Sequence, residues 1–169
     1  MTFVASLTIP QLGCGAGYAL WAFRAAVIGR FDCPALIRGF DRVFEDRSAE
    51  ARGALLHFAR AIGSQGNRRI GLGQPGCCGV TSDELSIVAV LAAAQNRDND
   101  RRDAHLLWLL GRRDVRIAAT TANAVGAAFK SGGLMIDPPP MQLHEPQAVK
   151  PFTIIGSGEY PATQGDLIH

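Results

Sequence analysis

The strongest constraint on the fold is the run of residues 85–94, which is apolar almost all the way round the helix it would form. Thr81 and Glu84 precede the run at the Thr-x-x-Glu spacing of a capping box, which predicts that a helix begins there. Because this helix has almost no polar face, other helices must surround it. The run is about half as long as a membrane span, so a transmembrane helix is not expected. It predicts instead a helix in the middle of a bundle.

Several amphipathic segments are available to surround that helix. Pro34, Ser48 and Asp114 stand where helices should begin, and Ser48 is expected to act as an N-cap. Apolar residues recur at helical spacing behind each of these positions. The predicted helices cover residues 15–30, 34–44, 48 to 63 or 66, 81–94, a stretch around 106–110, and 114–130.

Small residues recur along the last of these helices. Ala118, Ala122 and Gly126 lie four positions apart, so they share one face. This spacing predicts that a neighbouring helix approaches closely along that strip. The segments together predict an all-α fold, a compact bundle of five or six helices over residues 1–136.

Two segments do not fit a helical pattern. Residues 66–80 contain five glycines and a proline, which predicts a central loop. Residues 137–169 contain the run Pro138-Pro139-Pro140 and further scattered prolines, which predicts an extended C-terminal arm. At most one strand is expected in this arm, around residues 152–155.

Charge is distributed unevenly between body and arm. Residues 1–136 carry 16 basic and 11 acidic side chains, a net charge of +5, whereas residues 137–169 carry one basic and four acidic side chains, a net charge of −3. Neither value approaches the basic stripe of a nucleic-acid-binding protein, so nucleic acid is not the expected partner. Without a positively charged N-terminal region or a long apolar span, the chain is expected to be cytoplasmic, with reduced cysteines.

The most informative local feature is the pair Cys77-Cys78 in a glycine-rich turn before the central helix. Cys14 and Cys33 also stand at predicted helix N-termini, so all four cysteines are candidates to converge on one pole of the bundle and hold zinc or an iron–sulfur cluster. Their spacing matches no paired Cys-x-x-Cys ligand pattern. Thiol-redox chemistry and simple packing of small residues at helix ends are the alternatives.

Other motifs carry less information. Residues 71–76 match Gly-x-Gly-x-x-Gly, but no confident strand precedes them, so a plain turn is expected rather than a nucleotide site. His57 is expected on the solvent-exposed side of its helix. Asp83 and Glu84 are acidic residues in a first helical turn, where they normally complement the helix dipole.

The segment from Cys77 to Leu85, CCGVTSDEL, is followed by an alanine-rich helix body. This arrangement resembles an uncharacterised group of small helical proteobacterial proteins with a Cys-rich turn before a Thr-x-Asp-Glu helix start. The resemblance extends over residues 15–135 at most and rests on one short motif. It implies a small helical fold and no particular activity, and the tail after Asp137 lies outside it.

No nucleophile, base and orienting group stand at a recognisable catalytic spacing, which favours a protein without enzymatic activity. We expect a helical scaffold or adaptor that binds another protein, or itself, through its C-terminal arm, with no cofactor. Phe152, Ile154 and Ile155 are the clustered apolar residues of the arm and hence its expected anchors. The alternatives are a zinc, iron–sulfur or thiol-redox protein that uses the Cys77–Cys78 turn, and an arginine-rich regulator that contacts nucleic acid.

Overall fold

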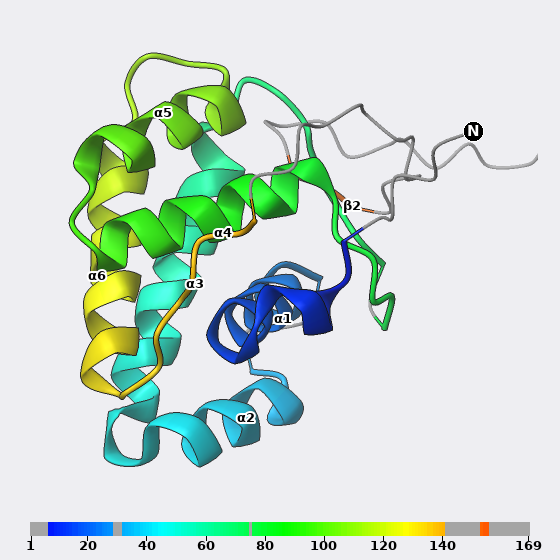
Figure 1. Ribbon diagram of the computed structural model, residues 1–169, viewed down its shortest axis with the longest axis vertical. Coiled ribbons are helices and arrows are strands. Elements are labelled where there is room, and N and C mark those ends of the chain that lie inside the picture. Colours follow the sequence, from blue (N-terminus) through cyan, green and yellow to red (C-terminus); the bar gives the residue numbers. More distant parts are fainter. Residues whose placement is uncertain (1–6, 29–31, 75, 141–152, 156–169) are drawn as a thin grey trace, which may run out of the picture.

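The computed structural model describes residues 7–28, 32–74, 76–140 and 153–155 (Figure 1). These residues form a bundle of six α-helices with two short strands, which confirms the predicted all-α fold. The elements in chain order are η1 (Ile9–Leu12), α1 (Cys14–Ile28), α2 (Pro34–Phe44), η2 (Glu45–Arg47), α3 (Ser48–Gln65), β1 (Ile70–Leu72), α4 (Ser82–Gln95), α5 (Asn99–Leu110), α6 (Arg116–Ser131) and β2 (Thr153–Ile155). Within these ranges no helix is long and apolar enough to cross a membrane.

Helix α4 occupies the middle of the bundle, as its apolar composition predicts. Every residue from Ile87 to Gln95 is buried, and Leu91 has no solvent-accessible surface. α4 packs on α5, α6 and α1, while α3 runs along α6 and also contacts α1 and α2 (Figure 1). The neighbouring helices therefore cover nearly the whole circumference of α4. This burial is what a helix without a polar face requires.

The small-residue strip on α6 lies against α4, as predicted. Ala118 and Ala122 are fully buried, and a Cβ atom added to Gly126 would lie 2.7 Å from the backbone nitrogen of Gln95. Such a separation is too short for any side chain larger than hydrogen. The missing Cβ of Gly126 thus allows the C-terminal end of α4 to contact the backbone of α6.

One predicted helix cap is confirmed and another is wrong. The Thr81 hydroxyl accepts a hydrogen bond from the Glu84 amide at 3.1 Å, and the Glu84 carboxylate accepts one from the Thr81 amide at 2.8 Å, which closes the capping box. Ser48 is not an N-cap, because its backbone is already helical at φ −52° and ψ −49°. The turn η2 leads directly into α3, and the Ser48 hydroxyl instead donates to the Asp41 carboxylate.

The loop predicted over residues 66–80 contains a short strand. β1 pairs antiparallel with β2, in the register Ile70 with Ile155, Gly71 with Ile154 and Leu72 with Thr153. β2 falls within the single strand expected around residues 152–155, whereas β1 was too short to predict from sequence. Ile70 and Leu72 are fully buried, so β1 joins the core although glycines surround it.

An aromatic cluster joins α1, α2 and α6. Tyr18 lies within 5.7 Å, 6.0 Å and 6.4 Å of Phe40, Phe44 and Phe129, measured between ring centroids. The Tyr18 hydroxyl is buried without a hydrogen-bond partner in the part of the chain that the structure describes. Burial raises the pKa of Tyr18 to about 12, because the phenolate would lose its hydration.

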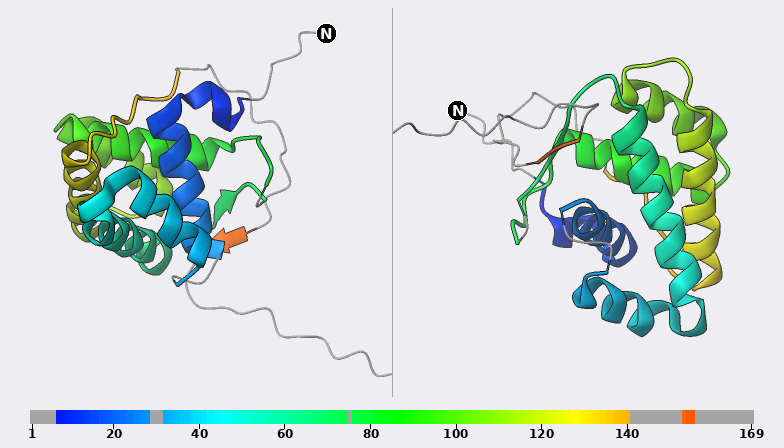
Figure 2. Two further views of the ribbon diagram at one scale, coloured as in Figure 1. Left: turned by 90° about the horizontal axis from the view of Figure 1, so that it is seen from below. Right: turned by 180° about the vertical axis from the view of Figure 1, so that it is seen from behind.

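The segment that follows α6 crosses α4 and extends the helical body beyond its last helix (Figure 2). The Gln95 side chain holds it: Nε2 donates to the Leu134 carbonyl at 2.9 Å, and Oε1 accepts from the Ile136 amide at 2.8 Å. Ile136 itself is 2% exposed. Residues 141–152 and 156–169 of the predicted arm lie outside the described residues.

Candidate functional site: the Cys77–Cys78 turn

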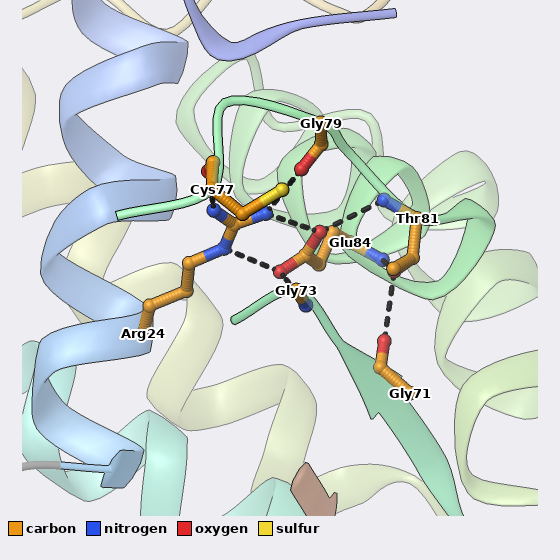
Figure 3. Close-up of polar contacts among 7 residues, drawn as sticks. All are labelled: Arg24, Gly71, Gly73, Cys77, Gly79, Thr81 and Glu84. Carbon is orange, nitrogen blue, oxygen red and sulfur yellow. Dashed lines mark hydrogen bonds and ion pairs between the residues drawn. The ribbon is translucent and has the colours of Figure 1, made fainter. Parts of the chain in front are cut away.

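An ion pair between α1 and α4 lies beneath the cysteine turn (Figure 3). Arg24 is 5% exposed and Glu84 is fully buried. Arg24 Nε donates to Glu84 Oε1 at 2.6 Å, and Arg24 Nη2 donates to Glu84 Oε2 at 2.8 Å. This bidentate geometry is the one that suits a guanidinium and a carboxylate best.

The same two side chains also bind the backbone of the loop. Arg24 donates to the Cys77 carbonyl at 2.7 Å and to the Gly79 carbonyl at 2.6 Å. Glu84 accepts from the Gly73 amide at 2.8 Å and from the Thr81 amide at 2.8 Å. Each carboxylate oxygen thus accepts two hydrogen bonds, which compensates for burying the charge. Glu84 acts as a structural group that holds the loop.

The start of α4 also holds β1. Asp83 accepts from the Gly71 amide at 2.6 Å, and the Thr81 hydroxyl donates to the Gly71 carbonyl at 2.8 Å. Alternate residues of a strand direct their backbone groups to opposite edges. Because Gly71 faces α4, Ile70 and Leu72 direct their amides and carbonyls toward the other edge, where β2 pairs.

A third contact with the turn comes from the N-terminal segment. The Ile9 amide donates to the Cys78 carbonyl at 2.8 Å, and the Val80 amide donates to the Leu7 carbonyl at 3.0 Å. Thr8 and Gly79 form an antiparallel bridge between these two hydrogen bonds. The backbone around the cysteine pair is therefore tied to α1, to α4 and to residues 7–9.

The structure places the four candidate cysteines at three separate points of the chain. Cys14 is the first residue of α1 and Cys33 precedes α2, whereas Cys77 and Cys78 lie between β1 and α4. Cys14, Cys77 and Cys78 are exposed and Cys33 is partly buried, and none forms a disulfide. Among the described residues no three His, Cys, Asp or Glu side chains are grouped to hold a metal ion, so the predicted convergence of the four cysteines on one pole is not seen there.

The predicted anchors of the arm fall only partly within the described residues. Phe152 lies outside them. The backbone of Ile154 and Ile155 belongs to β2 and pairs with β1. The arm therefore returns to the helical body at the strand that α4 holds in place.

The Gly-x-Gly-x-x-Gly match over residues 71–76 is not arranged as a phosphate site. The amides of Gly71 and Gly73 donate to the carboxylates of Asp83 and Glu84, which leaves neither amide free for an anion. A Cβ atom on Gly73 would collide with Arg24 Nη2. The glycine at this position thus permits contact with the buried guanidinium. Residues 71 and 72 belong to β1, so the segment is not the plain turn that was expected.

The importance of Arg24 and of its pairing with Glu84 was not predicted. Asp83 and Glu84 were expected to act as dipole partners of α4, and no role was predicted for Arg24. The sequence did contain a signal for this pair, because an arginine on the apolar side of a helix needs a buried acceptor.

Comparisons of the chain with protein-family models, with curated proteins and with solved structures find no match.

Proposed function

We propose that this protein is a non-enzymatic scaffold or adaptor that binds another protein, or a second copy of itself, through its C-terminal arm. The observation that supports this proposal is the pairing of β2 with β1, in which the arm adds a strand to the helical body. Strand addition is a common mode of peptide recognition, because the backbone supplies affinity and alternate side chains supply specificity. If β2 of one chain paired with β1 of a second chain, the two chains would form a dimer.

The edge of β1 that β2 occupies is well suited to accept a strand from another molecule in place of β2. Asp83 and Thr81 engage the backbone of Gly71 on the opposite edge, so only one edge of β1 accepts a strand. The pairing in the described residues extends over three residue pairs. A contact of this length is small enough for an equivalent strand from outside to compete with it.

A labelled peptide with the sequence of residues 148–158 tests the proposal. It is titrated by fluorescence anisotropy into the full-length chain and into Ile155→Pro, in which proline removes an amide that faces β1. We expect the variant to bind the peptide more tightly than the unmodified chain, because its own strand no longer competes.

Thr163→Pro is the matched control, since it introduces the same residue eight positions beyond β2. It should bind the peptide as the unmodified chain does. If neither the unmodified chain nor Ile155→Pro binds the peptide, β1 does not accept a strand from outside and the proposal fails. Light scattering of the same samples shows whether a second copy takes the place of the peptide.

A further inference from the structure

The outer face of α5 is apolar, and no other element of the described residues covers it. α5 lies at the edge of the bundle, where it packs on α4 and α6 (Figure 1). Its buried side carries three leucines, Leu106, Leu109 and Leu110. Ala104, Leu107 and Trp108 lie on the opposite side, since positions three and four apart share a face of a helix, and all three are exposed. We call these three residues the outer stripe of α5.

We propose that the outer stripe is the interface of a symmetric dimer, in which α5 packs antiparallel on α5 of a second copy of the chain. A twofold axis makes such an interface self-complementary, because each residue meets the same partner in both copies. With the axis at the level of residue 106, Trp108 of one copy faces Ala104 of the other, so the largest side chain of the stripe meets the smallest. Leu107 then lies beside the axis and contacts Leu107 of the second copy. This interface uses no residue of the arm or of β1.

Trp108 is a preorganised anchor for this contact. Its side chain has 50% of its surface exposed, although the guanidinium carbon of Arg68 lies 4.2 Å from the centroid of its ring. Arg68 is itself held in place, because it donates to the Trp108 carbonyl at 3.1 Å and forms an ion pair with Asp83. A ring that is fixed before association loses little freedom on binding. Tryptophan is also enriched among the residues that dominate the binding energy of interfaces.

The charges at the two ends of α5 indicate a second copy as the partner. At the N-terminal end, Asp98 and Asp103 form ion pairs with arginines of the same helix, whereas Asp100 forms none among the described residues. Arg112 and Arg113 follow the C-terminal end and also form no ion pair in the described part of the chain. The helix therefore presents an unpaired negative charge at one end and two unpaired positive charges at the other.

Antiparallel packing brings these opposite charges together at both ends of the interface. Asp100 and Arg112 lie six positions before and six positions after residue 106, so each faces the other across the twofold axis. Parallel packing would instead place like charges side by side. Exposed ion pairs add little affinity, but they select the orientation in which two helices associate.

The size of the contact sets its strength. One short helix face is smaller than most stable interfaces, so we expect a weak dimer. It should form at high protein concentration and dissociate at the low micromolar concentrations used for unfolding experiments. Leu107, with 42% of its surface exposed, then contributes to association rather than to the stability of the monomer.

The test is sedimentation equilibrium of the full-length chain from low micromolar to near millimolar concentrations. We expect the average mass to rise from 18.0 kDa toward twice that value. Leu107→Glu should weaken the dimer at least about tenfold, because it places a charge at the centre of the apolar contact. Met135→Glu is the matched control and should not change the dimer, since Met135 is exposed to a similar degree on the segment after α6. Circular dichroism checks that both variants remain folded.

Exchange of the terminal charges tests the antiparallel orientation. Asp100→Arg should self-associate more weakly than the unmodified chain, and so should the double variant Arg112→Glu with Arg113→Glu, because like charges then meet at both ends of the interface. An equal mixture of the two variants should form a heterodimer, because each introduced charge then faces an opposite one. A loss of folding in either variant would not produce this recovery.

Three results would overturn the proposal: a chain that stays monomeric over the whole series, a dimer that Leu107→Glu leaves intact, and a mixture of the charge variants that forms no heterodimer. Ile155→Pro should dimerise as the unmodified chain does. If it abolishes the dimer while Leu107→Glu does not, self-association uses the arm instead of α5. Leu107→Glu should still bind the peptide of residues 148–158 as the unmodified chain does, so strand addition to β1 and the α5 dimer can fail separately.

Discussion

At the scale of single residues, Arg24 and Glu84 show how one buried pair organises a loop that has little regular structure of its own. An isolated buried ion pair is often replaced by apolar residues without loss of stability. This pair differs because it also satisfies two backbone carbonyls and two backbone amides. Removing both charges would take these partners away from two buried amides and two partly buried carbonyls.

Glu84→Gln should therefore destabilise the protein by about 3 to 5 kcal/mol, because it leaves the Arg24 charge buried and uncompensated. Urea unfolding followed by circular dichroism measures the change. Asp114→Asn is the control, since it breaks an arginine–carboxylate pair on the surface and should change the unfolding midpoint little. The double variant Arg24→Met with Glu84→Gln should not recover stability. Recovery would show that the pair does not hold the loop.

Tyr18 gives a prediction about pH. The pKa of Tyr18 is raised by burial from 10.0 to about 12, so between these values the folded chain keeps a proton that the unfolded chain loses. Stability contributed by this group is complete below pH 10 and decreases as the pH rises toward 12.

Tyr18→Phe should reduce this alkaline loss of stability, and at pH 8 it should be at least as stable as the unmodified chain because the Tyr18 hydroxyl has no partner in the described structure. Urea unfolding at several pH values checks both statements. Tyr160→Phe serves as the comparison and leaves Tyr18 as the single tyrosine for absorbance titration. An alkaline transition of equal size in Tyr18→Phe would contradict the assignment.

At the scale of elements, the central position of α4 makes Leu91 a sensitive position. Leu91 is completely buried, so Leu91→Ala should cost about 2 to 5 kcal/mol through lost burial and the cavity left behind. Leu107 lies on α5 with 42% of its surface exposed, and Leu107→Ala should change stability by no more than about 0.5 kcal/mol. Thermal and urea unfolding measure both changes. Equal effects of the two substitutions would place α4 outside the core.

Two glycines in helices should respond in opposite directions to alanine. At Gly126 a Cβ atom would lie within 3.0 Å of the backbone of α4, so Gly126→Ala should cost about 1 to 3 kcal/mol. At Gly53 in α3 a Cβ atom would meet nothing within 4 Å, and Gly53→Ala should stabilise by about 0.4 to 1 kcal/mol. Urea unfolding of both variants compares them directly. A stabilising Gly126→Ala would show that α4 and α6 do not approach closely.

Sequence periodicity predicted the helices well, because each has a local cause. Thr81 and Glu84 cap α4 with their own side chains, within four residues of sequence. The lack of a Cβ atom on Gly126 is likewise visible in the sequence, and it lets another helix approach α6 closely there. The partners of Arg24 and the strand β1 were not predictable in the same way. The hydrogen bonds of Arg24 join residues 53 to 60 positions apart, and β1 pairs with residues 81 to 85 positions away. Local propensity carries no information about such pairs.

At the scale of the whole molecule, the residues that follow α6 still pack on the helical bundle. Leu134 and Ile136 are hydrogen-bonded to the buried Gln95, and a side chain on Gly15 would collide with the Met135 carbonyl. The segment after α6 thus covers α4 and α1. Ile136 is a buried core residue, and it is also the last residue of the expected helical domain 1–136.

Two truncations separate this covering segment from the arm. A chain of residues 1–140 loses β2 but keeps the contacts of Gln95, so it should retain helical circular dichroism and unfold cooperatively. A chain of residues 1–133 should be less stable, because Gln95 would be buried with both of its strongest hydrogen bonds removed, at a cost of roughly 1 to 3 kcal/mol for each unsatisfied group. The 1–140 chain should also bind the strand peptide more tightly than the full-length chain. Unfolding of the 1–140 chain would instead show that β2 is required to complete the core.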